Sequence, residues 1–312
     1  MIKEAAITAE QGGVRLDAAL FHAFPTSSRA FVRQAIASGA VLVDGRPAFK
    51  GQRLRGGEKI AVRALAECAD NQVRPNAAVQ VFPVYEDASL LAYDKPAGQS
   101  VHPLRFDEED TLMNGVVARH PECVPLGDRP LMAGALHRID AMTTGLVLVA
   151  RTAAAFANVR AQFAAREVEK TYLALVEGEV RSGGTIELDL AHDPHSRQCR
   201  MIDAHRNRLT NAERAALRPL HAVTRYEPLA TRRVENEIRT LLKVVIFTGV
   251  THQIRASLAL AGMHIVNDRL YGAFAVEGME GHCLHSLSAR FRHPETGEEL
   301  EIATKTLPTW AS

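Results

Sequence analysis

The apolar residues of this chain are concentrated in short runs that have the length and composition of β-strands. Four such runs lie at residues 90–93, 146–149, 172–176 and 241–247. Helical spacing of apolar residues falls between them, at residues 153–164 and 251–261. Strands outnumber helices and do not alternate strictly with them, which argues against a doubly wound fold. The pattern favours an α+β domain built on a mixed, largely antiparallel β-sheet with flanking helices.

A smaller unit precedes these runs, at residues 14–66. Two short helices are expected first, and Ser27 or Ser28 can cap the second of them. Asp44 and Gly45 then form a strong hairpin signal between two short strands. This unit is expected to be a small α/β domain.

Basic residues are crowded into the first unit. The whole chain has a formal net charge of only +1, so overall charge gives no support for nucleic-acid binding. Between residues 14 and 63, however, nine Lys or Arg residues stand against three Asp or Glu, a local excess of +6. Such a unit can hold phosphates electrostatically, although a solvated charged face is the plain alternative.

Four stretches of the first unit match a known pattern. They are R-L-D at 15–17, S-R at 28–29, I-A-S-G-A-V-L-V-D-G at 36–45 and L-R-G-G-E-K-I at 54–60. They resemble the small RNA-binding domain of a small-subunit ribosomal protein, of tyrosyl-tRNA synthetases and of several RNA-modifying enzymes. In such domains the two helices present basic side chains to RNA phosphates. Arg29 and Arg33 are four residues apart and share one helix face, so the resemblance implies that they contact RNA.

Composition divides the remainder of the chain. Residues 1–13 are expected to form an N-terminal tail. Residues 67–80 are polar, contain Pro75 and have no clear period, so they are expected to be a linker. The second unit should extend over residues 81–308. Within it, residues 203–220 carry many charges and no strand signal, which is typical of a surface insertion.

The sequence also bears on compartment and metal content. No apolar run approaches the roughly 20 residues of a membrane span, and the N-terminus lacks the apolar stretch of a secretory signal. The four cysteines contain no C-x-x-C pair, which fits a reducing cytoplasm. The segment His-Cys-Leu-His at 282–285 has no second ligand pair at zinc-site spacing. We therefore expect a cytoplasmic protein with no membrane partner and no metal site.

The sharpest local feature is L-H-R-I-D-A-M-T-T-G-L at residues 136–146. Asp140 lies just before a turn of small residues, and an apolar strand follows directly. A strand entry suits a catalytic group, because the sheet is rigid and the turn leaves the side chain accessible. From these residues alone, an aspartate that merely forms the turn is the more common case.

Five further stretches accompany this feature. They are D-K-P-A-G and V-H-P within 94–103, K-T-Y at 170–172, T-G-V-T-H-Q-I-R at 248–255, H-I-V-N-D and Y-G within 264–272, and F-R-H-P-E-T-G-E at 291–298. Together, and in this order, the six resemble the RluA-type pseudouridine synthases, whose signature reads H-R-L-D-x-x-T-S-G-L. The resemblance covers about residues 85 to 300.

The resemblance implies that Asp140 is the catalytic residue of an RNA-modifying isomerase. The reaction breaks the bond between uracil and ribose, turns the base, and rejoins it through ring carbon 5. An ionised carboxylate at the sugar suits either covalent attack or removal of a ribose proton, and both courses stay open. Nothing is oxidised and no group leaves, so no metal, nucleotide or organic cofactor is expected.

Asp140 must stay ionised in a pocket that excludes water, and it therefore needs a fixed cation. The resemblance pairs it with Arg255. Thr251 is a plausible N-cap for the following helix and would place Arg255 in its first turn. A surface arginine on an amphipathic helix is the alternative that the residues alone would favour.

The same resemblance assigns roles around Asp140. Tyr172 is expected to stack on the target uracil while its hydroxyl assists proton removal, which is compatible with a partly buried strand tyrosine. Arg138 should share a face with Asp140 if the segment is extended, and should fill the space that the flipped-out base leaves. Lys170 and Ile254 complete the expected substrate-binding set. His137 is expected to anchor its loop by a hydrogen bond.

Three positions depart from the family pattern. Val250 replaces an arginine and Ser257 a histidine, and we expect these changes to weaken phosphate contacts or to alter the choice of RNA. Asn267 replaces a glycine, a mild change if the site is left-handed, because asparagine tolerates that conformation.

Two rival functions remain at this point. One is a non-catalytic RNA-binding protein, and the other is an unrelated carboxylate hydrolase that acts on nucleosides, which would need a second acid–base carboxylate. The favoured function has RNA as its partner, with ribosomal RNA the first choice and transfer RNA the second. No obligate protein partner is expected.

Overall fold

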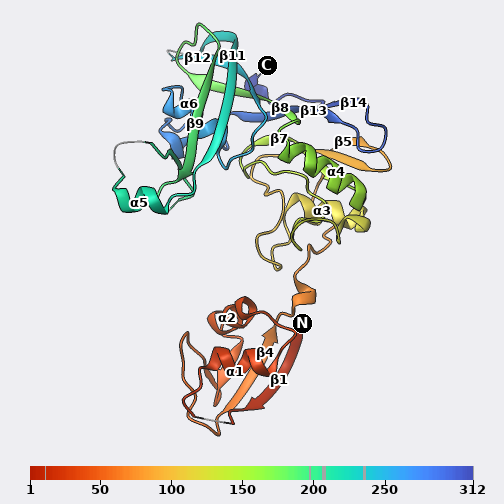
Figure 1. The fold of residues 1–312 in the computed structure, drawn as a ribbon, viewed down its shortest axis with the longest axis vertical. Helices are drawn as coiled ribbons and strands as arrows, with labels where there is room; N and C mark the ends of the chain where they lie inside the picture. The colour runs from red at the N-terminus through yellow and green to blue at the C-terminus, as the bar shows by residue number, and fades with distance from the viewer. Residues whose placement is uncertain (11, 197, 206–208, 235–236, 312) are drawn as a thin grey trace. The chain divides into compact units, whose positions relative to one another are not determined.

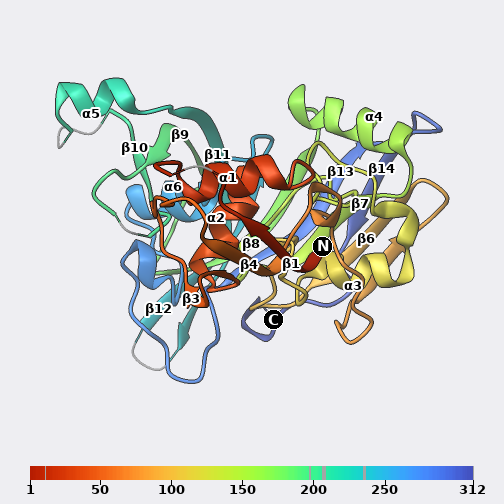
Figure 2. The ribbon, with the colours of Figure 1, turned by 90° about the horizontal axis from the view of Figure 1, so that it is seen from below.

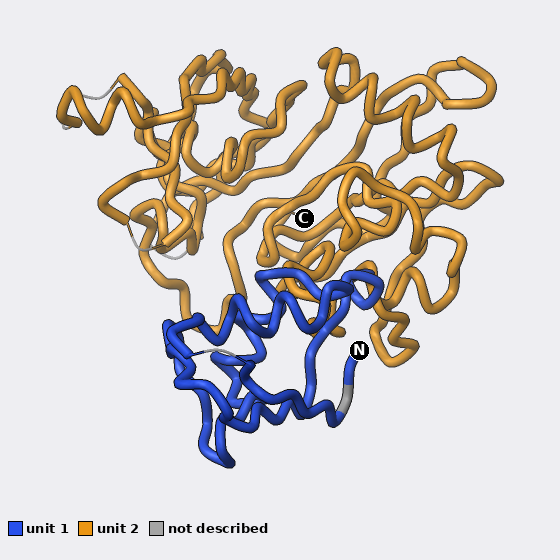
Figure 3. Tube along the Cα trace, turned by 60° about the horizontal axis from the view of Figure 1, so that its bottom comes forward, with its two compact units in different colours: residues 1–72 blue, residues 73–312 orange. Residues whose placement is uncertain are grey.

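The chain folds as two compact units, residues 1–72 and residues 73–312 (Figure 3). The computed structural model describes residues 1–10, 12–196, 198–205, 209–234 and 237–311. Each unit has its own hydrophobic core. No helix among these residues is long and apolar enough to cross a membrane.

The N-terminal unit is a four-stranded antiparallel sheet with two helices. Its elements are β1 Ile2–Thr8, α1 Leu16–Ala23, α2 Arg29–Ala37, β2 Val41–Val43, β3 Arg46–Pro47, β4 Lys59–Leu65 and the short 3-10 helix η1 Cys68–Asp70. The strand order is β1-β4-β2-β3. The Ser28 hydroxyl caps α2 by accepting a bond from the Phe31 amide, and Asp44 and Gly45 both have positive φ, as the hairpin signal requires.

The expectation of a tail at residues 1–13 is wrong for its first part. Ile2–Thr8 is the strand β1, paired antiparallel with β4 from Ile2 opposite Leu65 to Thr8 opposite Lys59. Ala5 and Ile7 are partly buried on the core of the unit. They alternate with exposed neighbours, the period that a half-buried edge strand requires. Acidic residues around this alternation concealed it in the sequence.

The second unit is built on one large sheet (Figure 1). Its strands are β5 Pro83–Glu86, β6 Leu90–Lys95, β7 Thr144–Ala150, β8 Glu169–Glu177, β9 Gly184–His192, β10 Met201–Asp203, β11 Leu220–Val234, β12 Glu237–Ile246, β13 Leu284–Arg292 and β14 Glu299–Ala303. Its helices are α3 Leu112–Arg119, α4 Ala153–Ala164, α5 Asn211–Ala216 and α6 Gln253–Leu260, with 3-10 turns η2 Pro121–Cys123, η3 Arg269–Tyr271 and η4 Thr309–Ala311.

The strand order is β10-β9-β11-β12-β8-β13-β7-β6-β5, with β14 added beside β13. β13 runs parallel to β7, and the other pairs formed by the described strands are antiparallel. The expected mixed, largely antiparallel sheet is therefore confirmed. Helix α4 packs on β7 and β13, whereas α6 packs on β9, β10 and β11 (Figure 2). The strands β8 and β13 join these two parts of the sheet.

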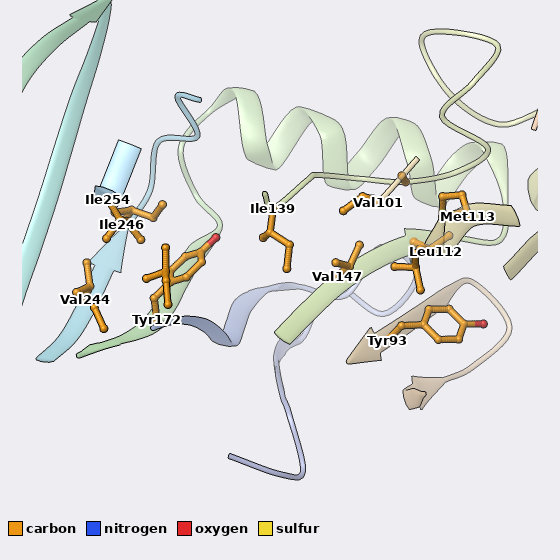
Figure 4. Packing of buried hydrophobic residues seen from close by; sticks show 14 of the residues in the cluster. Tyr93, Val101, Leu112, Met113, Ile139, Val147, Tyr172, Val244, Ile246 and Ile254 are labelled. Atoms are coloured by element: carbon orange, nitrogen blue, oxygen red, sulfur yellow. The ribbon is translucent and has the colours of Figure 1, made fainter. Parts of the chain in front are cut away.

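The main core lies along this junction. Figure 4 shows side chains of β6, β7, β8 and β12 packed with Ile139 and with residues of α3 and α6. The four apolar runs of the sequence lie in β6, β7, β8 and β12, and the two expected helices correspond to α4 and α6. The missed strands β9, β11 and β13 mix polar and apolar residues, so they lack a continuous apolar run.

The expected linker is not a free connection. Residues 68–70 form η1 in the first unit, whereas Val73 is buried in the core of the second. The Asn114 side chain donates to the Arg74 carbonyl, and the Asn76 amide donates to the Asn114 carbonyl. Residues 203–220 contain α5, whose N-terminus is capped by Thr210, while residues 206–208 of that segment lie outside the described residues.

Candidate active site

A cavity of about 360 Å³ opens within the second unit. It brings together the six residues of the second unit that were expected to act in catalysis or substrate binding, and these are Arg138, Asp140, Lys170, Tyr172, Ile254 and Arg255. The first two precede β7, the next two lie on β8, and the last two lie in the first turn of α6. Three segments that are far apart in the sequence therefore line one hollow.

The segment before β7 alternates as the extended prediction requires. Arg138 is exposed, Ile139 is buried in the core, and Asp140 is half-buried at the cavity. The Thr143 amide donates to the Asp140 carbonyl across 3.0 Å and closes the turn. Arg138 makes no hydrogen bond or ion pair with any residue that the structure describes. Its cation is therefore available at the cavity.

Gly145 fixes the strand that follows this turn. It pairs with Ser286 where β7 and β13 run parallel, and its φ is +108°. A Cβ atom at this position would lie 2.8 Å from the Ser286 nitrogen and closer still to the Ser286 carbonyl oxygen. Glycine is therefore required for the close approach of the two strands beside Asp140.

The Asp140 carboxylate is held from one side. Its Oδ2 accepts a hydrogen bond from Arg255 Nη1 at 2.8 Å, and no described group hydrogen-bonds to its Oδ1. The Asp140 side chain is 23% exposed, against 8% for Arg255. One carboxylate oxygen is thus fixed by a buried cation, while the other has no hydrogen-bond partner among the described groups.

Arg255 is itself held by a second carboxylate. Its Nε and Nη2 donate to the two oxygens of Asp268 at 2.7 and 2.8 Å, and the Asp268 side chain is only 2% exposed. Burial opposes the charge on Arg255, but the hydrogen bonds to Asp268 and the charges of Asp268 and Asp140 outweigh it and raise the pKa of Arg255. Arg255 is therefore a permanent cation.

The helix α6 starts differently from the prediction. Thr251 is not its N-cap, because His252 occupies that position with a left-handed φ of 53° and caps no amide with its side chain. The Gln253 side chain secures the preceding loop instead. Its Oε1 accepts from the Val250 amide and from the Thr248 hydroxyl, and its Nε2 donates to the Val223 carbonyl. Arg255 still lies in the first turn.

Tyr172 is both a core residue and a cavity residue. It is 6% exposed, lines the cavity, and lies beside Val244, Ile246 and Ile254 in Figure 4. Burial, with a smaller contribution from the Asp140 charge, raises the pKa of Tyr172 to about 12 against the opposing hydrogen bond of Ser286. Its hydroxyl is therefore protonated at neutral pH.

Two lysines face backbone carbonyls around the cavity. Lys170 donates to the Thr248 carbonyl at 2.7 Å, and burial lowers its pKa to about 8. Lys95 is fully buried and donates to the carbonyls of Pro96 and Ala141 at 2.7 and 2.8 Å. Burial lowers the pKa of Lys95 to about 7, although the charge of Asp140 opposes this. Lys95 thus fastens the backbone immediately after Asp140.

Lys95 and Asp268 were missed as site residues. Both lie inside stretches that carried the family resemblance, at D-K-P and V-N-D, so their positions were visible in the sequence. The sequence did not show which group each side chain contacts, namely the Ala141 carbonyl for Lys95 and Arg255 for Asp268. A buried charge with a defined partner is the feature that distinguishes them, and it appears only after folding.

Several histidines have hydrogen-bonding roles. His137 Nε2 accepts from the Leu148 amide at 3.0 Å, and burial lowers the pKa of His137 to about 3. His282 and His285 are bonded to Thr143 and Thr144 respectively. The described residues contain no group of His, Cys, Asp or Glu side chains that could hold a metal ion.

The departures from the family pattern have separate structural settings. Ser257 is fully buried and accepts a hydrogen bond from Thr224, so its own hydroxyl is directed into the protein, and its effect on the choice of RNA stays a prediction. Val250 lines the cavity. Asn267 has a φ of 63° and is left-handed, and its amide donates to the carbonyls of Met279 and Gly281.

Arg29 and Arg33 line a hollow in the N-terminal unit, between α1 and α2. The Arg29 guanidinium lies 5.2 Å from the centre of the Phe21 ring, and the Arg33 Nε donates to the Arg29 carbonyl. Arg15 lines the same hollow but is paired with Asp17. The two arginines therefore present cations on one face, as their spacing predicted.

Comparisons with known proteins agree with this arrangement. The RNA pseudouridylate synthase family matches residues 89–260, and the S4 domain matches residues 14–60. A ribosomal large subunit pseudouridine synthase D of Xanthomonas campestris is 34% identical over 97% of this chain and 88% of its own length. The proteins of that name from Pseudomonas aeruginosa and Escherichia coli K12 are 31% and 30% identical over 96% and 95% of this chain, and over 91% and 88% of their own lengths.

Solved structures give the same result. Human RNA pseudouridylate synthase domain containing 1 superposes with a TM-score of 0.57 at 25% identity, covering 75% of this chain and 86% of that one. Human RNA pseudouridylate synthase domain containing 4, at 20% identity and a TM-score of 0.53 over 74% of this chain and 90% of that one, supports the fold. The family match over residues 89–260 and the relatives aligned over almost the whole chain show that the chain belongs to the RluA-type RNA pseudouridine synthases.

Proposed function

We propose that this enzyme isomerises specific uridines in large-subunit ribosomal RNA and that Asp140 acts on the ribose of the target nucleotide. The supporting observation is the asymmetry of the Asp140 carboxylate. Asp140 lines the cavity, its Oδ2 accepts a hydrogen bond from Arg255, and its Oδ1 has no hydrogen-bond partner among the described groups. A fixed cation keeps the carboxylate ionised while one oxygen remains available to react.

The reaction conserves all atoms. The bond from uracil N1 to ribose C1′ breaks, the base turns, C5 bonds to C1′, and the proton lost from C5 is balanced by one gained at N1. Asp140 Oδ1 can either attack C1′ or remove a proton from C2′. The permanent charge of Arg255 favours the ionised aspartate in both courses.

Tyr172 supports the turning base. Its ring borders the cavity, and a planar ring can stack on uracil. Because its pKa is raised to about 12, its hydroxyl carries a proton at neutral pH and is a donor. It can therefore assist removal of the C5 proton only by passing on its own proton in the same step.

Arg138 is suited to the vacated base stack. Its exposed side chain lies at the cavity without an ion-pair partner among the described residues. Extruding a base from its stack costs a few kcal/mol, which an inserted planar cation can offset.

The proposed substrate rests on two observations. The relatives from three bacteria are named for the large ribosomal subunit and align over most of their lengths. The N-terminal unit also presents Arg29 and Arg33 on one face, where phosphates can bind. Transfer RNA is the second candidate. A nucleoside hydrolase is not supported, because the chain belongs to an isomerase family.

Pseudouridine mapping by carbodiimide labelling and primer extension tests the proposal. Total RNA from cells that lack this gene is incubated with wild type, Asp140→Ala, or the control Asp107→Ala, which removes an exposed carboxylate that does not line the cavity. A new stop in large-subunit RNA with wild type and the control, but not with Asp140→Ala, is expected. A stop that survives Asp140→Ala would refute the role of the aspartate, and a stop confined to transfer RNA would refute the substrate.

A further inference from the structure

His252 also faces the Asp140 carboxylate. Its Nε2 lies 3.7 Å from Asp140 Oδ2, the oxygen that accepts from Arg255, and its side chain lines the cavity. His252 has a left-handed φ of 53°, a conformation that is uncommon for a residue other than glycine, although histidine adopts it more readily than most. Such conformations persist where surrounding contacts hold them, and they concentrate at functional sites.

The second ring nitrogen of His252, Nδ1, contacts Tyr271. His252 Nδ1 lies 3.1 Å from Tyr271 Oη, and the two rings meet edge to face at 5.8 Å. Tyr271 is 5% exposed, and the Arg255 guanidinium lies 5.2 Å from the centre of its ring. Tyr271 thus contacts both groups that face Asp140 Oδ2.

The hydrogen bonds determine which histidine nitrogen carries the proton. The Met201 amide of β10 donates to Tyr271 Oη at 2.9 Å. Among the described residues, His252 Nδ1 is the one remaining hydrogen-bond partner of that hydroxyl. The hydroxyl proton is therefore satisfied only if it is donated to Nδ1, because a buried unpaired donor is costly. Nδ1 is then the acceptor, and the neutral imidazole carries its proton on Nε2.

We propose that Tyr271 holds His252 in the Nε2–H form and that His252 is a positioning residue for Asp140. This inference rests on the proposed role of Asp140. With its proton on Nε2, His252 directs an N–H dipole at Oδ2 from 3.7 Å, beyond hydrogen-bond distance but on the same oxygen as Arg255, and leaves Oδ1 to the ribose. The opposite tautomer would turn a lone pair towards the carboxylate and repel it.

The strand β10 takes part in this arrangement. The chain of contacts begins at the Met201 amide, passes through Tyr271 and His252, and ends at Asp140. β10 pairs with β9 at the edge of the sheet. An edge strand that does not line the cavity thereby fixes the proton position of a group that does.

Two substitutions of His252 separate a donor from a space-filling ring. The amide of His252→Gln can reach the Nε2 position, whereas the shorter His252→Asn tolerates the left-handed backbone but cannot reach Asp140. The rate is measured under single turnover as tritium released from C5 of labelled uridine, in an unmodified transcript of the RNA segment found by mapping. We expect a fall of about tenfold for Asn, within the range of coupling between contacting residues, and substantial recovery for Gln. RNA affinity should be unchanged in both variants.

Tyr271→Phe tests the tautomer. It should slow the single-turnover rate about tenfold in the wild-type background and have no further effect in His252→Asn, because the hydroxyl acts through the histidine. The unpaired Met201 amide is common to both backgrounds and cancels in this comparison. Equal losses in both backgrounds, or a Gln variant as slow as Asn, would overturn the proposal. The role of Asp140 is judged separately, by whether Asp140→Ala abolishes tritium release.

Discussion

Arg255 lies between two carboxylates that differ in their surroundings. Asp268 is buried and binds it through two hydrogen bonds, whereas Asp140 is partly exposed and binds it through one. Asp268 therefore fixes the guanidinium plane, and the remaining Nη1 is directed at Asp140. The geometry assigns a structural carboxylate and an accessible carboxylate to the same cation.

Removing the charge of Asp268 should weaken the fold more than removing a surface charge. Asp268→Asn leaves Arg255 buried with one carboxylate, and loss of one partner from a buried pair costs about 3 kcal/mol. The free energy of unfolding, measured by urea titration, should fall by about this amount. The control Asp107→Ala loses an exposed ion pair and should change by less than about 0.5 kcal/mol. Equal effects of the two variants would contradict the structural role of Asp268.

Lys95 should make stability depend on pH. Its folded pKa of about 7 lies below the value of 10.5 expected for an unfolded lysine. Between these values the unfolded chain binds more protons, so this group makes stability rise with pH, by up to about 1.4 kcal/mol per pH unit. Below pH 7 Lys95 is charged in the folded protein as well, so the free-energy cost of burying its charge is fully present. Lys95→Met should flatten the slope of unfolding free energy between pH 7.5 and 9.5, and an unchanged slope would contradict the lowered pKa.

The sequence predicted some of these residues and not others. Asp140, Arg255 and Tyr172 converge on one cavity, as the motifs indicated. Thr251 was wrongly predicted as a cap, because the loop is secured through the Gln253 side chain and turns through a left-handed residue. Neither the Gln253 side-chain bonds nor the left-handed turn can be recognised from the local sequence, because the Gln253 side chain also bonds to Val223 on the distant strand β11.

At the scale of elements, β7 pairs in parallel with β13 directly after the turn that contains Asp140, so this pairing fixes the position of the turn. Strands that bury both faces, such as β6 and β7, were predicted because their residues are continuously apolar. β11 was missed because half of its surface is exposed and carries charge. The edge strand β1 was missed for the same reason.

Gly145→Ala should disrupt the contact between β7 and β13. The added Cβ would meet the Ser286 backbone and would also strain a positive φ. Gly178→Ala is a matched control, since Gly178 has a φ of +86° and no heavy atom within 4 Å of the added Cβ. The control should lose about 1 kcal/mol of unfolding free energy from backbone strain, and Gly145→Ala at least about 2 kcal/mol more. Chemical denaturation measures both, and equal losses would mean that the close approach is unimportant.

At the scale of the whole molecule, the two units have separate tasks in the proposed function. The cavity lies wholly within residues 73–312, and the arginine face of α1 and α2 lies wholly within residues 1–72. The sequence distinguished these units by charge and spacing. The limits of the units differ from the predicted ones because β1 packs in the first unit and Val73 in the core of the second, and composition reveals neither contact.

The arginines of the first unit should contribute to the salt dependence of RNA binding. Each phosphate contact changes the slope of log affinity against log salt by about 0.7 to 0.9. The double variant Arg29→Ala/Arg33→Ala should therefore reduce the slope by about 1.5 and weaken RNA binding. The isomerisation rate of the enzyme saturated with RNA should be unchanged. Arg181→Ala removes an arginine that is 83% exposed and paired with Glu179, and serves as the control. A slope equal to that of the control would argue against phosphate contacts on this face.

The pairing of β7 with β13 has a consequence for synthesis on the ribosome. β7 begins at Thr144, but the strand that flanks it on the side of β8 begins only at Leu284. A growing chain can complete residues 1–72 early, whereas the centre of the second sheet can form only after residues 284–292 have been made. Contacts so distant along the chain form slowly and leave strand edges open in the meantime. A translation product that stops before Leu284 would carry Asp140, Tyr172 and Arg255 and still have no assembled pocket.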